Sequence, residues 1–102
     1  MISIKSNKDF LKCYRKGKRF TFTSVVVYAF KNSSGLSRLG ITASKKVVGN
    51  SPQRNRAKRI IRQAYRELGG FSPGYDIIIS AKSEINFAKS TDLKKELSGL
   101  KI

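Results

Sequence analysis

The chain of 102 residues has no histidine, a single cysteine and only six acidic residues. Without histidine it cannot form a Ser-His-Asp triad or a Cys-His pair, and it offers no imidazole to a metal ion. Cys13 alone can form neither an internal disulfide nor a cysteine-rich zinc site, so it indicates a reducing compartment. The few acidic residues leave the chain poorly equipped for general acid–base or two-metal chemistry.

Long hydrophobic runs are also missing. The longest one covers residues 25–30, whereas a membrane-spanning helix needs roughly 20 apolar residues. The first residues lack the apolar stretch of a secretory signal. A hydrophobic fraction of 39% suits one modest core. We therefore expect a single domain over 1–102 that is soluble and cytoplasmic, with no membrane partner.

Positive charge is abundant and unevenly placed. Lysine and arginine number 22, which gives a net charge of +16. Residues 10–66 contain 15 of them and no acidic residue, whereas residues 67–102 hold five acids and five lysines. Such a one-sided block indicates a polyanionic partner. Nucleic acid is favoured over an anionic membrane, because the block contains no long amphipathic helix with bulky apolar anchors.

Hydrophobic periodicity and turn residues predict six elements. In chain order they are a helix at 6–16, strands at 20–30 and 37–44, a helix at 51–67, a strand at 75–81 and a helix at 91–100. We expect the first two strands to form an antiparallel hairpin, Ser6 and Asp9 to form a capping box, and Ser51 to cap the second helix. The order α-β-β-(β)-α-β-α predicts an α+β fold, a two-layer α/β sandwich with its helices on one side of a small sheet.

The segment 54–66 carries six basic residues and no acidic one, on a helix with an apolar stripe. Arg54, Lys58, Arg62 and Arg66 lie at successive i+4 spacings. Each like-charged pair at that spacing costs roughly 0.2–0.5 kcal/mol. A solvated face is the alternative interpretation, but such a face normally carries Glu–Lys pairs. We therefore expect this helix to bind phosphate groups, for which arginine offers bidentate donors.

The residues on and around this helix resemble the signature of a known family. The matching motifs are Ser44-Lys45-Lys46, then Gly49-Asn50, then Arg54-Asn55-Arg56-x-Lys58-Arg59 and Arg62. Together they resemble the bacterial ribonuclease P protein subunit, and segments 9–17, 38–41 and 75–79 are similar to it as well. The sequence departs from the family pattern before the helix: the connection at 47–49 is one residue longer, and Ser51-Pro52-Gln53 replaces a common apolar pair.

The resemblance implies a place in a ribonucleoprotein endonuclease. In that particle an RNA subunit, with its own Mg²⁺, removes the 5′ leader of precursor tRNA. The protein then binds no metal or cofactor itself and contains no catalytic residue. Its expected partners are the catalytic RNA and precursor tRNA, with no protein partner evident. The resemblance also implies an unusual left-handed βαβ crossover around the basic helix. The residues expected to bind the RNA subunit are Lys45, Lys46, Arg54, Asn55, Arg56, Lys58, Arg59, Arg62 and Arg66.

Six of the ten aromatic residues lie at residues 10–30, in the first part of the basic block. Rings among cations suit single-stranded RNA, although each ring could instead belong to the core. The resemblance implies a cleft between the first helix and the sheet that binds the leader. Its expected residues are Phe10, Tyr14 and Tyr28, with Lys12, Lys16 and Lys31 as flanking cations. We assign Phe20, Phe22 and Phe30 to the core or the cleft floor, and Asp76 to a turn or cap rather than to a metal site.

Two other functions fit the composition. A structural RNA-binding protein, such as a small ribosomal protein, shares the size and charge but needs no free single-strand channel. A duplex-DNA-binding protein would place the basic helix in a major groove. Packing of that helix into a continuous β–α–β layer would argue against the latter.

Overall fold

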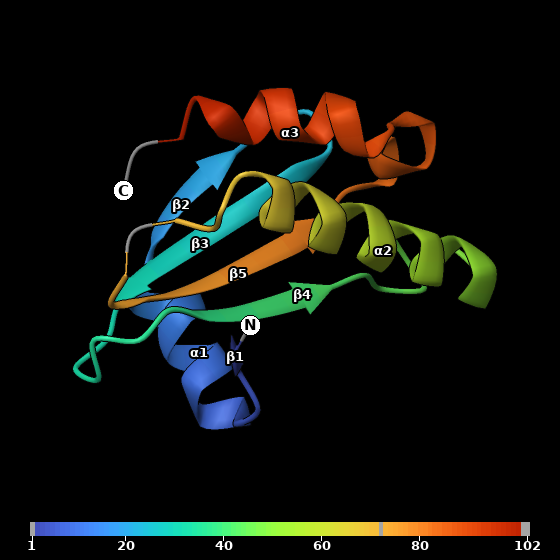
Figure 1. Cartoon of the computed structure of the whole chain (residues 1–102). Helices are drawn as coiled ribbons and strands as arrows, with labels where there is room; N and C mark the ends of the chain where they lie inside the picture. Colours follow the sequence, from blue (N-terminus) through green and yellow to red (C-terminus); the bar gives the residue numbers. More distant parts are fainter. Residues whose placement is uncertain (1, 72, 101–102) are drawn as a thin grey trace.

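The computed structural model describes residues 2–71 and 73–100, which form a five-stranded mixed sheet with three α-helices and one 3-10 helix (Figure 1). Across the sheet the strands are β1 (Ile2–Ser3), β4 (Arg38–Thr42), β5 (Tyr75–Ala81), β3 (Val25–Lys31) and β2 (Lys18–Thr21). The helices are α1 (Asn7–Lys16), α2 (Ser51–Glu67), η1 (Ser83–Phe87) and α3 (Ser90–Ser98). The expected α+β class and order of elements are confirmed, with the short β1 in addition.

The expected hairpin between the first two strands is wrong. The segment 20–30 contains parts of two strands, β2 and β3, which pair antiparallel around a reversal at residues 22–24. β3 and β4 are separated by β5, which runs antiparallel to β3 and parallel to β4. The central position suits β5, because Ile77, Ile78 and Ile79 are all fully buried and need apolar cover on both faces.

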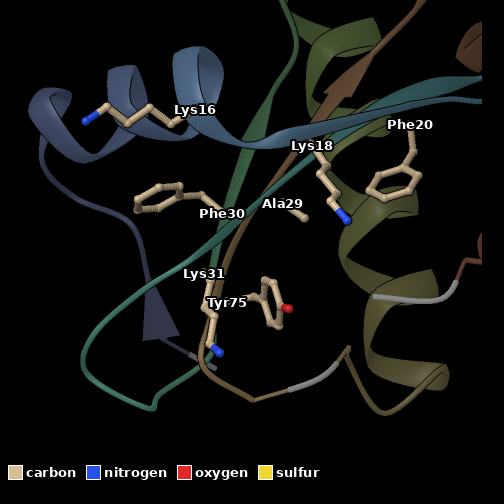
Figure 2. A pocket seen from close by; sticks show the side chains of 7 residues that line it. All are labelled: Lys16, Lys18, Phe20, Ala29, Phe30, Lys31 and Tyr75. Atoms are coloured by element: carbon tan, nitrogen blue, oxygen red, sulfur yellow. The ribbon is translucent and has the colours of Figure 1, made fainter.

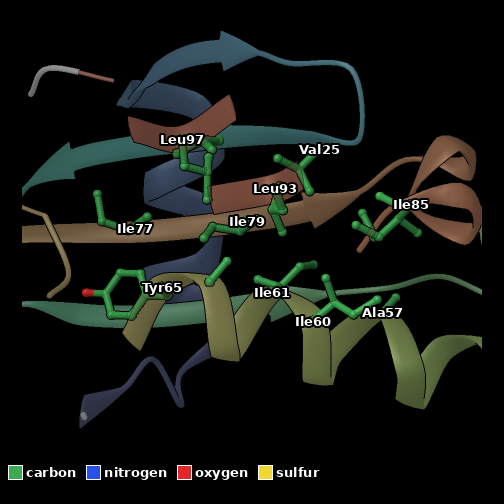
Figure 3. Packing of buried hydrophobic residues seen from close by; sticks show 14 of the residues in the cluster. Val25, Ala57, Ile60, Ile61, Tyr65, Ile77, Ile79, Ile85, Leu93 and Leu97 are labelled. Carbon is green, nitrogen blue, oxygen red and sulfur yellow. The ribbon is translucent and has the colours of Figure 1, made fainter. Parts of the chain in front are cut away.

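The helices cover both faces of the sheet, so the expected one-sided arrangement is also wrong. Ile77 and Ile79 point into the main core with residues of α2 and α3, among them Ile61 and Leu93 (Figure 3). Ile78, between them in the chain, points to the other face and packs in a smaller cluster around Cys13 of α1. Alternate residues of a strand face opposite sides, so the one apolar run of β5 serves two helical layers.

The helix boundaries follow the sequence closely. α2 spans the predicted residues and has a proline in its first turn. Its cap is Asn50 rather than Ser51, because Asn50 and Gln53 form a reciprocal capping box. Ser6 caps α1 by accepting a hydrogen bond from the Lys8 backbone, but Asp9 binds Arg38 and does not complete the expected capping box. Between β4 and β5, α2 forms a crossover joining adjacent parallel strands. The left-handed sense of this crossover remains a prediction.

Candidate nucleic-acid interface

α2 buries one side and presents most of its positive charge on the other. The buried residues are Ala57, Ile60, Ile61, Ala64 and Tyr65. At 3.6 residues per turn, Asn55, Arg59, Arg62 and Arg66 lie opposite that stripe, and all four are exposed. Arg54 and Lys58 lie on one flank and are partly exposed. The first turn contains no acidic residue, so the positive charge of the helix N-terminus is not offset there.

Arg56 differs from the other basic residues of α2. Its Nη1 donates to the Ile85 carbonyl at 3.1 Å and its Nη2 to the Ala88 carbonyl at 2.6 Å. These bonds tie α2 to the end of β5 through η1 and the residue that follows it. Arg56 was expected to bind RNA with its neighbours, but in the structure its guanidinium has an intramolecular role.

Lys45 and Lys46 lie in the turn that leads from β4 to α2, and both are exposed. The turn is closed by hydrogen bonds from the backbone of Val48 to Ser44 and of Gly49 to Lys45. Val48 is buried and its carbonyl accepts a hydrogen bond from Asn86 at 2.9 Å. Gly49 has φ +125°, a conformation that other residues rarely adopt. The turn therefore holds both lysines at the start of α2.

The three aromatic residues expected in the cleft come together where α1 meets the sheet. The rings of Tyr14 and Tyr28 pack edge to face with centroids 4.7 Å apart. The Tyr14 hydroxyl lies 3.3 Å from the Ser80 hydroxyl, and Tyr14 remains 37% exposed. Phe10 lies over Gly40, where a Cβ atom would approach its ring to 2.7 Å. Glycine in β4 therefore lets the Phe10 ring rest directly on the sheet.

The expected cations do not all lie beside these rings. Lys12 and Lys16 are exposed on α1. Lys31 pairs with Tyr75 and shares the α2–α3 face with Ala29, so it points away from Tyr28. Arg19 pairs with Tyr28 across the sheet and is exposed on the same face. Sequence reasoning missed Arg19, because its side depends on the pairing register of β2.

The basic helix and the aromatic side chains packed between α1 and the sheet, called the aromatic cleft below, approach each other beside β4. A hollow of about 200 Å³ lies between them. It is lined by Ser3, Ile4, Phe10, Leu39, Gly40, Ile41, Lys58 and Arg62. Cations of α2 thus lie next to a ring of α1, although 48 positions separate Phe10 from Lys58 in the sequence. One surface therefore combines both predicted RNA-binding features.

A partly buried ion network holds α1 against the sheet. The Arg38 guanidinium donates to both Asp76 carboxylate oxygens, at 2.8 and 2.6 Å, and to Asp9 of α1 at 3.1 Å. Asn32 donates to the same Asp76 carboxylate at 2.8 Å. Hydrogen bonding to Asp76 raises the pKa of Arg38 above its usual value. Asp76 is 2% exposed, so it serves as an internal anchor rather than as the expected turn or cap.

Neither Cys13 nor the acidic residues form a reactive centre in the part of the chain that the structure describes. Burial raises the pKa of the Cys13 thiol to about 11, and the thiol donates weakly to the Asp76 and Tyr28 carbonyls. No three histidine, cysteine or acidic residues gather there in a group that could hold a metal ion. Among the same residues, no helix is long and apolar enough to cross a membrane.

Comparisons with known proteins agree on one family. A family model described as Ribonuclease P matches residues 2–101. The ribonuclease P protein component of Clostridioides difficile (strain 630) is 40% identical over 99 residues, covering 95% of this chain and 86% of the relative. The Staphylococcus aureus RNase P protein has a TM-score of 0.83 at 32% identity, covering 96% of this chain and 90% of that one. The Thermotoga maritima RNase P protein has a TM-score of 0.81 at 26% identity, with 96% and 93% coverage.

Proposed function

The chain belongs to the ribonuclease P protein family, and we propose that it is the subunit that binds the catalytic RNA and the 5′ leader of precursor tRNA in a ribonuclease P particle. The main support for this proposal is the hollow beside β4, where cations of α2 lie next to the aromatic cleft of α1. One protein surface can there contact a folded RNA and an adjacent single strand.

The exposed side of α2 is the proposed contact with the RNA subunit. Arginine forms bidentate hydrogen bonds with phosphate, and counterion release makes such binding strongly salt-dependent. Arg59, Arg62 and Arg66 are exposed without acidic neighbours on their side of the helix, and Lys45 and Lys46 extend the positive charge toward its start. Arg56 contributes indirectly, because it fixes α2 to the η1 segment.

The cleft beside α1 is the proposed contact with the leader. Tyr14 offers an exposed ring for base stacking, and Tyr28 holds it edge to face. The hydroxyls of Thr42 and Ser80 lie 2.7 Å apart on the same face and can bond to sugar or base atoms. Arg19, Lys12 and Lys16 supply positive charge for the phosphates of the strand.

The hydrolysis itself is assigned to the RNA subunit with its bound Mg²⁺. The protein's six acidic residues are dispersed, and two of them, Asp9 and Asp76, are engaged by Arg38. Its contribution is to bind the leader and to offset the charge of the assembled RNAs. Since the RNA subunit and precursor tRNA are cytoplasmic in bacteria, we place the protein in the cytoplasm.

Reconstitution of the particle tests this function. A ribonuclease P RNA and a precursor tRNA are combined at low Mg²⁺, with and without the protein, and leader cleavage is measured. The protein should increase cleavage, and the Arg59→Ala/Arg62→Ala variant should weaken assembly. A Lys89→Ala/Lys95→Ala variant removes the same charge from the neighbourhood of α3 and serves as control. Equal cleavage with and without the protein, or equal loss in both variants, would contradict the assignment.

Neither alternative function accounts for the structure equally well. A duplex-DNA-binding protein needs a recognition helix that projects into a groove. α2 instead packs lengthwise on the sheet within the β4–α2–β5 crossover. A purely structural RNA-binding protein does not require the exposed Tyr14 ring beside a continuous basic surface.

A further inference from the structure

A second hollow lies on the face of the sheet opposite the aromatic cleft. Its volume is about 400 Å³, within the range of small-molecule sites. Lys18 and Phe20 of β2, Ala29 and Lys31 of β3, and Tyr75 of β5 line it (Figure 2). Lys16 and Phe30 also line it, although their side chains point away from the others in Figure 2. None of the three cleft rings, Phe10, Tyr14 and Tyr28, lines it, whereas two of the cations expected beside them, Lys16 and Lys31, do.

Strand register explains why the hollow exists. Lys18 pairs with Ala29 and Lys31 pairs with Tyr75, so these four side chains share one face. Ala29 is small, so it leaves a depression between larger side chains on β2 and β5. Farther along β3, Val25 and Val27 belong to the core cluster that includes Leu93 and Leu97 of α3. The hollow therefore begins where the helical layer ends.

The lining combines positive charge with rings. No ion pair is found for Lys16, Lys18 or Lys31 within residues 2–71 and 73–100, and no acidic side chain lines the hollow. Phe20 and Tyr75 lie at opposite ends of the depression, with the Lys18 amine directed between them in Figure 2. Both rings are only partly buried, so each has a face available to a ligand.

We propose that this hollow binds a nucleotide of single-stranded RNA, with its base against Tyr75 or Phe20 and its phosphate between Lys18 and Lys31. Stacking on an aromatic ring together with cations at the backbone is how proteins bind single strands without strict sequence preference. Binding here does not depend on the leader cleft, because the two sites lie on opposite faces of β3. The protein can then hold two separate single-stranded segments.

Nuclear magnetic resonance of the full chain tests the site directly. The labelled protein is titrated with uridine 5′-monophosphate, uridine, inorganic phosphate and a hexauridylate RNA. We expect saturable shifts at Lys18, Ala29 and Lys31 with the nucleotide. Uridine and phosphate alone should bind at least about fivefold more weakly, because each lacks one of the two interactions. The hexamer should displace the nucleotide from the hollow.

Variants identify the side chains responsible. Tyr75→Leu keeps apolar bulk but removes the ring, so nucleotide affinity should fall at least about fivefold. Lys18→Ala/Lys31→Ala should produce a similar or larger loss. Lys89→Ala/Lys95→Ala, with the same change in net charge, should bind the nucleotide normally. A thermal melt checks that each variant is folded. Ala29→Leu, which fills the hollow, is a second test of nucleotide binding at the same site.

Several results would overturn the proposal. Equal shifts with phosphate and the nucleotide would indicate an ion bound by lysines alone. Shifts confined to the residues around Tyr14 would assign all nucleotide binding to the cleft. Failure of the hexamer to displace the nucleotide would exclude an RNA strand. Leader cleavage tests the proposed function separately: if it fails while the shifts at Ala29 persist, the hollow stands and only the ribonuclease P role is lost.

Discussion

The two faces of the sheet bury different amounts of apolar surface. On the α2–α3 face, most side chains of β3, β5 and β4 join one large core cluster. On the α1 face, the buried cluster of the described residues contains only Ile4, Cys13 and Ile78, with aromatic rings at its margin. Hydroxyl groups and an ion network occupy much of the remaining area on that face. The difference indicates that stability depends mainly on the α2–α3 face, whereas the α1 face, where we propose that the leader binds, buries less apolar surface.

The largest expected effect is on the core face. Leu93 of α3 is fully buried there, so Leu93→Ala should lower the free energy of unfolding by about 2–5 kcal/mol. Leu11→Ala, at a half-exposed leucine of α1, should change it by less than ~1 kcal/mol. Urea unfolding of both variants measures the difference. Similar losses would show that burial of Leu93 in the core is not the source of the effect.

The ion network around Asp76 lies on the α1 face but is expected to contribute strongly to the free energy of unfolding. Asp76→Asn removes a buried charge from Arg38, which should cost about 2–3 kcal/mol of unfolding free energy. Asp9→Asn is the matched control, because Asp9 is 28% exposed and accepts one bond from the same guanidinium. It should cost less than ~1 kcal/mol. If the two costs were equal in urea unfolding, burial of Asp76 would not be the source of the effect.

Substitution of the cleft ring should separate binding from stability. Tyr14→Ala should weaken binding of precursor tRNA to the holoenzyme by about 1–3 kcal/mol through lost stacking, with less than ~1.5 kcal/mol lost in unfolding. Affinity for mature tRNA, which lacks the leader, should stay unchanged. Filter binding with both RNAs measures the contrast. Equal weakening of binding to precursor and mature tRNA would indicate that Tyr14 contacts the tRNA body rather than the leader.

The smallest effect concerns two arginines of α2. Arg59→Ala should reduce the slope of log affinity for the RNA subunit against log salt concentration by about 0.7–0.9. It should change the free energy of unfolding by less than ~0.5 kcal/mol. Arg56→Ala should instead lower stability by about 1–3 kcal/mol, because two backbone carbonyls lose their donor. Binding measured from low to high salt, combined with thermal melting, tests the pair. The reverse pattern would make Arg56 the RNA contact and Arg59 the structural residue.

Local patterns determined α2 and β5, whose bounds match the prediction at both ends. A continuous apolar stripe with basic residues around it favours one helix, and a short apolar run bounded by turns favours one buried strand. The basic block is a property of the sequence, so it indicates a polyanionic partner without knowledge of the fold. Two of the motifs that resemble the family, the run from Arg54 to Arg62 and residues 75–79, lie in these segments.

Tertiary pairing decided the rest. The neighbours of β4 in the sheet and the position of α1 on the second face depend on contacts between segments that are distant in the sequence. The hydrophobic periodicity of each segment does not predict these contacts. Side chains alternate with a period of two, so the register of β2 and β3 determines which face each residue occupies. That register places Arg19 beside Tyr28 and turns Lys31 toward the opposite hollow. In the same way, only folding brings the carbonyls of Ile85 and Ala88 to Arg56, because these residues lie 29 and 32 positions later in the chain.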